Sequence, residues 1–367
     1  MKITGCFLAL LGVMYLAQPS ISYLTAASPI YYRAAQWSPD GEKLAFYSNQ
    51  NGNDDIWIAN ADGSNLINLT QESTVNNRFP MWSPDGLFIS YSEVNETTSE
   101  VWIMRRDGNN KLNLSQALPE ASYFPRWSPD GHYIAFLVDV IPGVTNEIWL
   151  AETNNFQIHK LGNFDHVFIR SISWSPTGAS LAFTRTIVDP TVSSIKDLKS
   201  LDQVRQDGVW QIDVRDDVEK PIVLDKYVQE LSWGANNELL LSVREESTTD
   251  IWIVNADGTE LTNLTTDIDV LVSDPVFSPD AQFIALMVHR EDVLYSWDIW
   301  VMKRDGSSKM NLTENLNYAN GFPDWNPDGK RITFESHLAP DSDFSSTPES
   351  SIWLVIMDKL LTTKLIG

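Results

Sequence analysis

The sequence of 367 residues is poor in cysteine and in positive charge, and both shortages limit what the protein can be. Its single cysteine, Cys6, lies near the amino terminus, so no disulfide within the chain can stabilise the fold. Only 26 Lys and Arg oppose 49 Asp and Glu, which gives a formal net charge of −23. Repulsion of phosphate groups therefore argues against nucleic acid and anionic lipid as partners, and it favours basic partners or divalent cations.

The motifs of common enzymes are also missing. The sequence has no G-x-S-x-G elbow, no glycine-rich phosphate loop and no H-x-x-x-H pair. Its five histidines come from different parts of the chain: His132, His159, His166, His289 and His337. A catalytic metal needs several converging imidazoles, and this spacing does not provide them. We expect no catalytic residue and no cofactor, although the acidic composition leaves a divalent cation at the centre of the fold as an open alternative.

A long hydrophobic run occurs only at the start of the chain. Lys2 gives a positive charge, Cys6 to Ala17 is an apolar run of secretory length, and Ser20 to Ser22 is a small-residue cleavage site. We interpret residues 1–22 as a signal peptide, with an uncleaved anchor as the alternative. This predicts an exported protein, periplasmic or extracellular, with no stable membrane insertion after cleavage.

A short motif with an aromatic residue followed by a turn returns at a nearly constant interval. The steps between its anchor aromatics are 45, 45, 47, 59, 44 and 48 residues, within the period of four-stranded propeller blades. The seven copies are Trp37-Ser38-Pro39-Asp40-Gly41, Trp82 to Gly86, Trp127 to Gly131, Trp174-Ser175-Pro176-Thr177-Gly178, Trp233-Gly234-Ala235, Phe277-Ser278-Pro279-Asp280 and Trp325-Asn326-Pro327-Asp328-Gly329.

The second copy shows the four-part unit that each motif opens. A strand ends at Trp82, and Ser83 to Gly86 has the Pro and Gly of a tight turn. Phe88 to Tyr91 and Glu100 to Met104 are rich in β-branched and aromatic residues, as strands are. Lys111 to Leu114 alternates polar with apolar residues, as a half-exposed outer strand does. Four strands of this kind make one blade.

The third strand of the unit also recurs in every copy. Its cores are Ile56-Trp57-Ile58, Val101-Trp102-Ile103, Ile148-Trp149-Leu150, Val209-Trp210-Gln211, Ile251-Trp252-Ile253, Ile299-Trp300-Val301 and Ile352-Trp353-Leu354. Thirteen of the fourteen Trp fall at these two repeat positions, which assigns them to packing between blades. We therefore predict an all-β protein whose residues 28–367 form a single seven-bladed β-propeller of four-stranded antiparallel blades. Six blades plus a degenerate unit is the alternative.

The order W-S-P-D-G, L-A-F, D-I-W, D-G and L-T resembles the TolB-type propeller repeat, a WD-repeat-like unit of bacterial envelope proteins. The resemblance covers about residues 30–367. The architecture associated with TolB is a small α/β domain followed by a six-bladed propeller. This chain differs from it, since it has seven repeats and no room for the extra domain. The resemblance implies the propeller fold and, more weakly, binding of peptidoglycan-associated lipoprotein and the Tol machinery. Similar repeats occur in oligogalacturonide lyases, which provide an enzymatic alternative.

Strand order predicts two unlike faces. The first-to-second and third-to-fourth turns are short and share one face, the turn face. The second-to-third loops and the connections between blades share the other, the long-loop face. That face receives two insertions, Thr184 to Asp207 in blade four and Ser336 to Ser350 in blade seven. Variable loops on a rigid scaffold are where function is usually found.

Polar residues of the long-loop face are the candidate site. We expect them to bind an envelope or extracellular protein or peptide, with the chain acting as a monomeric, non-catalytic scaffold. A carbohydrate-binding protein or oligogalacturonide-lyase-like enzyme acting at the channel mouth is the alternative, and a merely hydrated mouth is the simplest interpretation. The candidates are Arg78, Tyr123, Asp165, His166, Tyr227, Asp274 and Asn320 around the mouth, and Asp189, Lys196 and Lys199 in the blade-four insertion.

Closing the ring requires an outer strand for the last blade, because an open sheet edge is a liability. Two segments are expected to supply it, either alone or together. One is Ser28 to Tyr32, after the signal, and the other is Thr362 to Ile366, at the end of the chain.

Overall fold

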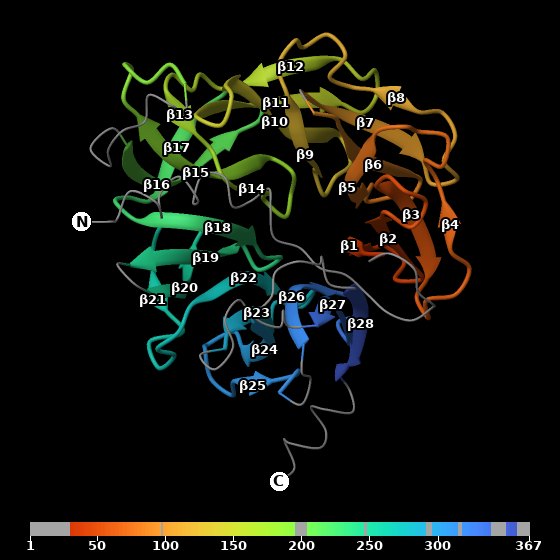
Figure 1. The fold of residues 1–367 in the computed structure, drawn as a ribbon. Coiled ribbons are helices and arrows are strands. Elements are labelled where there is room, and N and C mark those ends of the chain that lie inside the picture. The colour runs from red at the N-terminus through yellow and green to blue at the C-terminus, as the bar shows by residue number, and fades with distance from the viewer. Residues whose placement is uncertain are drawn as a thin grey trace, which may run out of the picture.

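A computed structural model describes residues 30–96, 98–194, 204–245, 248–290, 296–314, 318–338 and 350–357. Within these ranges every regular element is a β-strand, and the strands form seven antiparallel sheets. The sheets stand around a common axis as the blades of a ring, and chain order follows the ring (Figure 1). The all-β, seven-bladed propeller predicted from the repeat is confirmed.

The first three blades each have four strands, paired in chain order from the innermost outward. Blade one contains β1 (Tyr32–Trp37), β2 (Lys43–Ser48), β3 (Asp55–Asn60) and β4 (Ile67–Asn68). Blade two contains β5 (Asn76–Trp82), β6 (Phe88–Val94), β7 (Ser99–Arg105) and β8 (Leu112–Asn113). Blade three contains β9 (Ser122–Trp127), β10 (Tyr133–Ile141), β11 (Thr145–Glu152) and β12 (Ile158–Leu161).

The other four blades follow the same order with two departures. Blade four contains β13 (Val167–Phe168), β14 (Ile172–Trp174), β15 (Ser180–Val188), β16 (Val204–Asp213) and β17 (Glu219–Val223). Blade five contains β18 (Tyr227–Trp233), β19 (Glu238–Glu245), β20 (Thr248–Asn255) and β21 (Thr262–Asn263). Blade six contains β22 (Val272–Phe277), β23 (Phe283–His289), β24 (Trp297–Lys303) and β25 (Met310–Asn311). Blade seven has three described strands, β26 (Tyr318–Trp325), β27 (Arg331–Leu338) and β28 (Ser350–Ile356).

The repeated turn forms as its residues require. In blade two, the amide of Gly86 donates to the carbonyl of Ser83 at 2.9 Å, and Gly86 has a φ of 67°, which glycine adopts without strain. The carboxylate of Asp85 accepts from the Ser83 hydroxyl at 2.5 Å and from the amide of Leu87 at 3.0 Å. The anchor Trp82 is buried between blades one and two, in a cluster with Ala45 and others from both blades. The assignment of the repeat Trp to packing is therefore confirmed at this position.

The innermost strands bend where one residue leaves the ladder, and we call this the bulge residue. It has a positive φ of about 50° and coincides with a register shift. In all but the first case proline follows the bulge residue. Because proline has no N–H, the break in the ladder leaves no unpaired backbone donor at that position. The bulge residues are Ala34, Phe79, Phe124, Asp274 and Phe322.

In blade four the innermost strand is split into β13 and β14. Both segments pair with β15, and Ile169 to Ser171 lies between them. The hydroxyl of Thr184 accepts the amides of Arg170 at 2.9 Å and Ser171 at 3.1 Å. Asn146 of blade three accepts the amide of Ile169 at 2.7 Å and donates to its carbonyl at 2.8 Å. Hydrogen bonds from side chains thus replace the backbone ladder that is missing between β13 and β14.

The expected role of Ser28 to Tyr32 in closing the ring is wrong for its described end. Tyr32 is the first residue of β1 and pairs with Ser48, so it extends blade one instead of adding to blade seven. The amide of Tyr31 likewise donates to the side chain of Asn49 at 2.8 Å. The physical reason is that these residues continue an established ladder. Thr362 to Ile366 lies outside the described residues.

Among the described residues, side chains join blade seven to blade one without a shared strand. The carboxylate of Asp324 on β26 accepts the amide of Trp37 at 3.2 Å. The carboxylate of Glu335 on β27 accepts the amide of Ala34. Strand β1 packs against β26, β27 and β28, as the neighbouring red and blue strands of Figure 1 show. We call this contact the seam.

Candidate functional site

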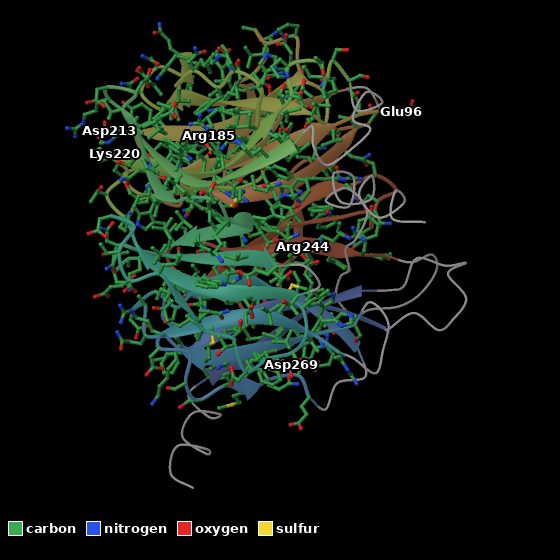
Figure 2. All side chains as sticks on the ribbon, turned by 90° about the vertical axis from the view of Figure 1, so that its left-hand side faces the viewer. Glu96, Arg185, Asp213, Lys220, Arg244 and Asp269 are labelled. Carbon is green, nitrogen blue, oxygen red and sulfur yellow. The ribbon has the colours of Figure 1, made fainter. Side chains whose placement is uncertain are left out.

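The two faces of the ring differ as the strand order predicts. Figure 2 shows the molecule from the side, with Asp213 and Lys220, at the β16–β17 turn, on one side. Glu96, in the loop after β6, lies on the opposite side (Figure 2). Asp213 and Lys220 mark the turn face, and Glu96 marks the long-loop face.

Among the described residues, the longest middle strands are in blades three and four, and they lead to the long-loop face. Strands β10, β15 and β16 have 9, 9 and 10 residues, whereas most middle strands of the ring have 6 to 8. Their extensions share a small apolar cluster in which Val144, Val188 and Val192 are buried, with Ile141 and Phe168 packed against them. This cluster joins the β10–β11 hairpin to the end of β15. We call residues 139–146, 165–168 and 186–192 the platform.

Tyr123 is one support of the platform. Its hydroxyl donates to the carboxylate of Asp139 at 2.6 Å, and the side-chain amide of Asn146 donates to that hydroxyl at 3.1 Å. Burial raises the pKa of Asp139, and the hydrogen bond from Tyr123 partly opposes the rise. The predicted contact residue Tyr123 is therefore occupied in positioning the β10–β11 hairpin.

Three other predicted residues lie on the surface of the platform. Asp165 and His166 are exposed, and the carbonyl of His166, which has a φ of 54°, accepts the amide of Val188 at 2.8 Å. The carboxylate of Asp189 accepts the hydroxyl and the amide of Thr191 at 2.6 and 2.8 Å, and these bonds lower its pKa. The structure brings these three residues together beside the end of β15. Lys196 and Lys199 lie outside the described residues.

Arg78 is bound within the ring. Its Nε lies 2.5 Å from Asp54, whose side chain is 1% exposed and also accepts the hydroxyl of Tyr31 at 2.5 Å. Burial, followed by the bond to Asp54, raises the pKa of Tyr31 to about 12. Burial alone would lower the pKa of Arg78, but the charge of Asp54 raises it. This predicted residue is part of an internal ion pair.

The remaining predicted residues lie on innermost strands. Asn320 is buried and accepts the hydroxyl of Ser336 at 2.7 Å. Tyr227 accepts a long hydrogen bond of 3.4 Å from Arg170. The amide of Asp274 donates to the carboxylate of Glu230 at 2.8 Å. Three of the predicted residues, Arg78, Tyr227 and Asp274, thus bond to the preceding blade.

Carboxylates collect around the axis in blades five to seven. Burial raises the pKa of Glu230, and burial followed by the charge of Glu230 raises that of Asp274. Burial also raises the pKa of Asp324 to about 7 and that of Glu335 to about 8. Among the described residues no three His, Cys, Asp or Glu side chains converge in a way that could hold a metal ion.

A cavity of about 270 Å³ opens between blades three and four, on the turn face. Sequence patterns did not predict a pocket there, and the one signal is the fourth copy of the turn motif, where Thr177 replaces the usual Asp. It lies away from the platform and is not part of the candidate site. Its lining includes Asp130, His132, Tyr133, Glu152, Asn154, Thr177 and Arg215.

Comparison with known proteins supports the fold but not a family. No family model matches the sequence, and no curated protein matches it. The β-propeller domain of the trilobed protease from Pyrococcus furiosus is similar in structure, with a TM-score of 0.60 and 14% identity over 88% of this chain and 95% of that one. What these comparisons support is the β-propeller fold alone. That protease domain is described as having an open velcro topology.

Two further solved structures are similar. Oligogalacturonate lyase from Vibrio parahaemolyticus has a TM-score of 0.60 and 12% identity over 88% of this chain and 89% of that one. TolB from Acinetobacter baumannii has a TM-score of 0.48 and 19% identity over 77% of this chain, which spans 62% of that TolB. At these identities the likeness shows the fold alone. None of the described residues form a helix long and apolar enough to cross a membrane.

Proposed function

We propose that the chain is an exported, non-catalytic scaffold that binds a protein or peptide partner on its long-loop face, at the platform. The observation that carries this proposal is the platform itself, where two extended hairpins are fastened by an apolar cluster and by the bonds of Tyr123 and Asn146. A fastened projection loses little conformational freedom on binding, which favours affinity. Its surface offers three exposed residues, Val140, Asp165 and His166.

Charge supports a basic partner. The formal net charge of −23 creates a field that accelerates encounter with positively charged proteins and repels negatively charged ones. Export rests on the apolar run of residues 6–17 and its flanking residues, which lie outside the described part of the chain.

The sugar-directed alternative is less well supported. A lyase acting at the mouth of the axis would need converging histidines, and no such group is found among the described residues. His289 packs edge-on against Trp297, with ring centroids 5.2 Å apart, and His166 lies on the platform. Similarity to the lyase is 12% in identity, which carries the fold alone.

Two exposed valines provide a matched test of the platform. Val140 is 50% exposed on the long-loop face, and Val218 is 45% exposed on the turn face. The purified chain and its Val140→Asp and Val218→Asp variants would be used to capture partners from an envelope extract, with quantitative mass spectrometry. We expect one protein to be captured by the parent and by Val218→Asp and to be lost with Val140→Asp. Equal capture by both variants would remove the platform as the binding surface.

A further inference from the structure

Repeat positions on the innermost strands have a structural task that can be read from their hydrogen bonds. The residue just before the anchor aromatic is Ser173 in blade four and Asp324 in blade seven. The hydroxyl of Ser173 accepts the amide of Trp233 in blade five at 3.0 Å, as Asp324 accepts that of Trp37 in blade one. In both cases a side-chain oxygen satisfies an amide of the next blade, which would otherwise stay unpaired.

Arg126 stands at the same position in blade three and cannot perform this task. A guanidinium has five donors and no acceptor, so it offers nothing to a backbone amide. The contact with blade four is made instead by its backbone, where the carbonyl of Arg126 accepts the indole N–H of Trp174 at 3.0 Å. The charge of Arg126 is therefore not required to join these blades.

The charge of Arg126 also lacks a counter-ion among the described residues. Among the described residues, the one hydrogen bond that the guanidinium donates runs from Nη1 to the carbonyl of Pro125 at 3.2 Å, and the guanidinium forms no ion pair. Burial lowers the pKa of this guanidinium, although a part of the residue is still accessible to solvent. A carboxylate in such a place can bind a proton and lose its charge, but an arginine cannot. Because the repeat position also accepts Ser, the fold itself does not need this unpaired charge, and we take Arg126 as the candidate binding group.

The hydrogen bond to Pro125 turns the guanidinium back toward the level of the bulge residues. Three of these are phenylalanines. The rings of Phe79 and Phe124 meet edge to face with centroids 5.2 Å apart, and Phe322 is 42% exposed. Phe124 is two residues from Arg126 on β9, so an apolar ring and an unpaired guanidinium belong to the same strand, an arrangement that suits a ligand with a carboxylate next to an apolar group.

We propose that Arg126 binds the terminal carboxylate of a peptide that ends in an apolar residue and enters the ring from the long-loop face. This inference rests on the proposed function, because it specifies that the carboxyl terminus of the partner peptide reaches the axis of the ring. Two parallel N–H donors of arginine match the two oxygens of a carboxylate. The net charge of −23 further requires that the partner carrying this end be neutral or basic overall.

The test uses N-acetyl-phenylalanine as the probe and N-acetyl-phenylalaninamide as its uncharged control. Arginine side chains labelled with ¹⁵N report binding through their Nε–H resonances, and Arg126→Gln identifies the resonance of Arg126. We expect the acid to shift that resonance in a saturable way, with affinity at least about tenfold above that of the amide. Arg106→Gln changes an exposed arginine of the turn face and should leave the titration unchanged.

Each other outcome overturns the proposal. If acid and amide bind alike, the carboxylate is not recognised. If galacturonic acid shifts the Arg126 resonance and N-acetyl-phenylalanine does not, the ligand is a sugar acid and not a peptide end. The two proposals fail separately, because loss of partner capture with Val140→Asp tests the platform and this titration does not involve the platform at all.

Discussion

The innermost strands of blades three and seven carry opposite charges at the same repeat position, Arg126 and Asp324. Only the charged side chain of Asp324 forms a hydrogen bond to the next blade. Asp324 accepts an amide across the seam and, with its pKa raised to about 7 by burial, can also take up a proton. Arg126 can do neither, and among the described residues it has no ion pair. The comparison teaches that a buried charge in a repeat protein should be judged by its hydrogen bonds, since structural charges find partners within the ring.

The largest expected effect concerns what the two strands share. Trp127 and Trp325 follow the two charged residues, and both are packed in the ring. Changing either to Ala should lower the free energy of unfolding by about 3–5 kcal/mol, because each substitution leaves a large cavity. Denaturant unfolding would measure the loss, with Trp→Phe at each site as the control. A loss below about 1 kcal/mol at one site alone would show that the strands differ in packing and not only in charge.

The next effect compares Arg126 with an arginine that has its partner. Arg78→Met leaves Asp54, whose side chain is 1% exposed, without its counter-ion, so we expect a loss of about 3 kcal/mol. Adding Asp54→Asn should recover part of this loss, because the unpaired buried charge disappears. Equilibrium unfolding of the two single variants and the double variant gives the coupling. Additive losses would contradict the view of Arg78 as an internal ion pair.

The fold and the candidate site could be predicted only in part from the sequence. The blades follow from anchors such as Trp82 and from turn residues such as Gly86, because both act locally. The sequence does not pair Arg78 with Asp54, 24 residues away, nor does it show that Tyr32 continues β1. Such partners depend on how neighbouring blades meet. For the same reason the sequence located the predicted mouth residues near the innermost strands, but it did not reveal the hydrogen bonds that they make within the ring.

A third prediction concerns pH and the seam. Burial raises the pKa of Asp324 from 3.8 to about 7 and that of Glu335 from 4.5 to about 8. Between about pH 4 and pH 8 the folded chain therefore holds protons that the unfolded chain has released, so stability falls as pH rises through this window. At about 1.4 kcal/mol per pKa unit, the two carboxyl groups together predict a loss of up to about 6 kcal/mol from pH 5 to pH 8.

Asp324→Asn tests whether the seam is responsible. Asparagine keeps an oxygen for the amide of Trp37 and cannot ionise, so the variant should lose less stability over the same pH range than the parent. Thermal unfolding at pH 5, 6.5 and 8 at constant ionic strength would show this. General relief of repulsion on a chain of −23 also favours acid, and Asp257→Asn, an exposed site, measures that background. If both variants depend on pH equally, the seam carboxylates contribute nothing special.

The smallest expected change in stability has the opposite sign. Arg126→Met keeps a long side chain and removes a charge that no described residue pairs, so the free energy of unfolding should stay within about 0.5 kcal/mol of the parent or rise by about 1 kcal/mol. Denaturant unfolding without ligand, beside Arg78→Met, measures it. A structural arginine and a binding arginine look alike in a sequence, but removing the first weakens the empty protein and removing the second does not. A loss as large as that of Arg78→Met would place Arg126 among the residues that hold the ring together, and its match to a carboxylate would then need another explanation.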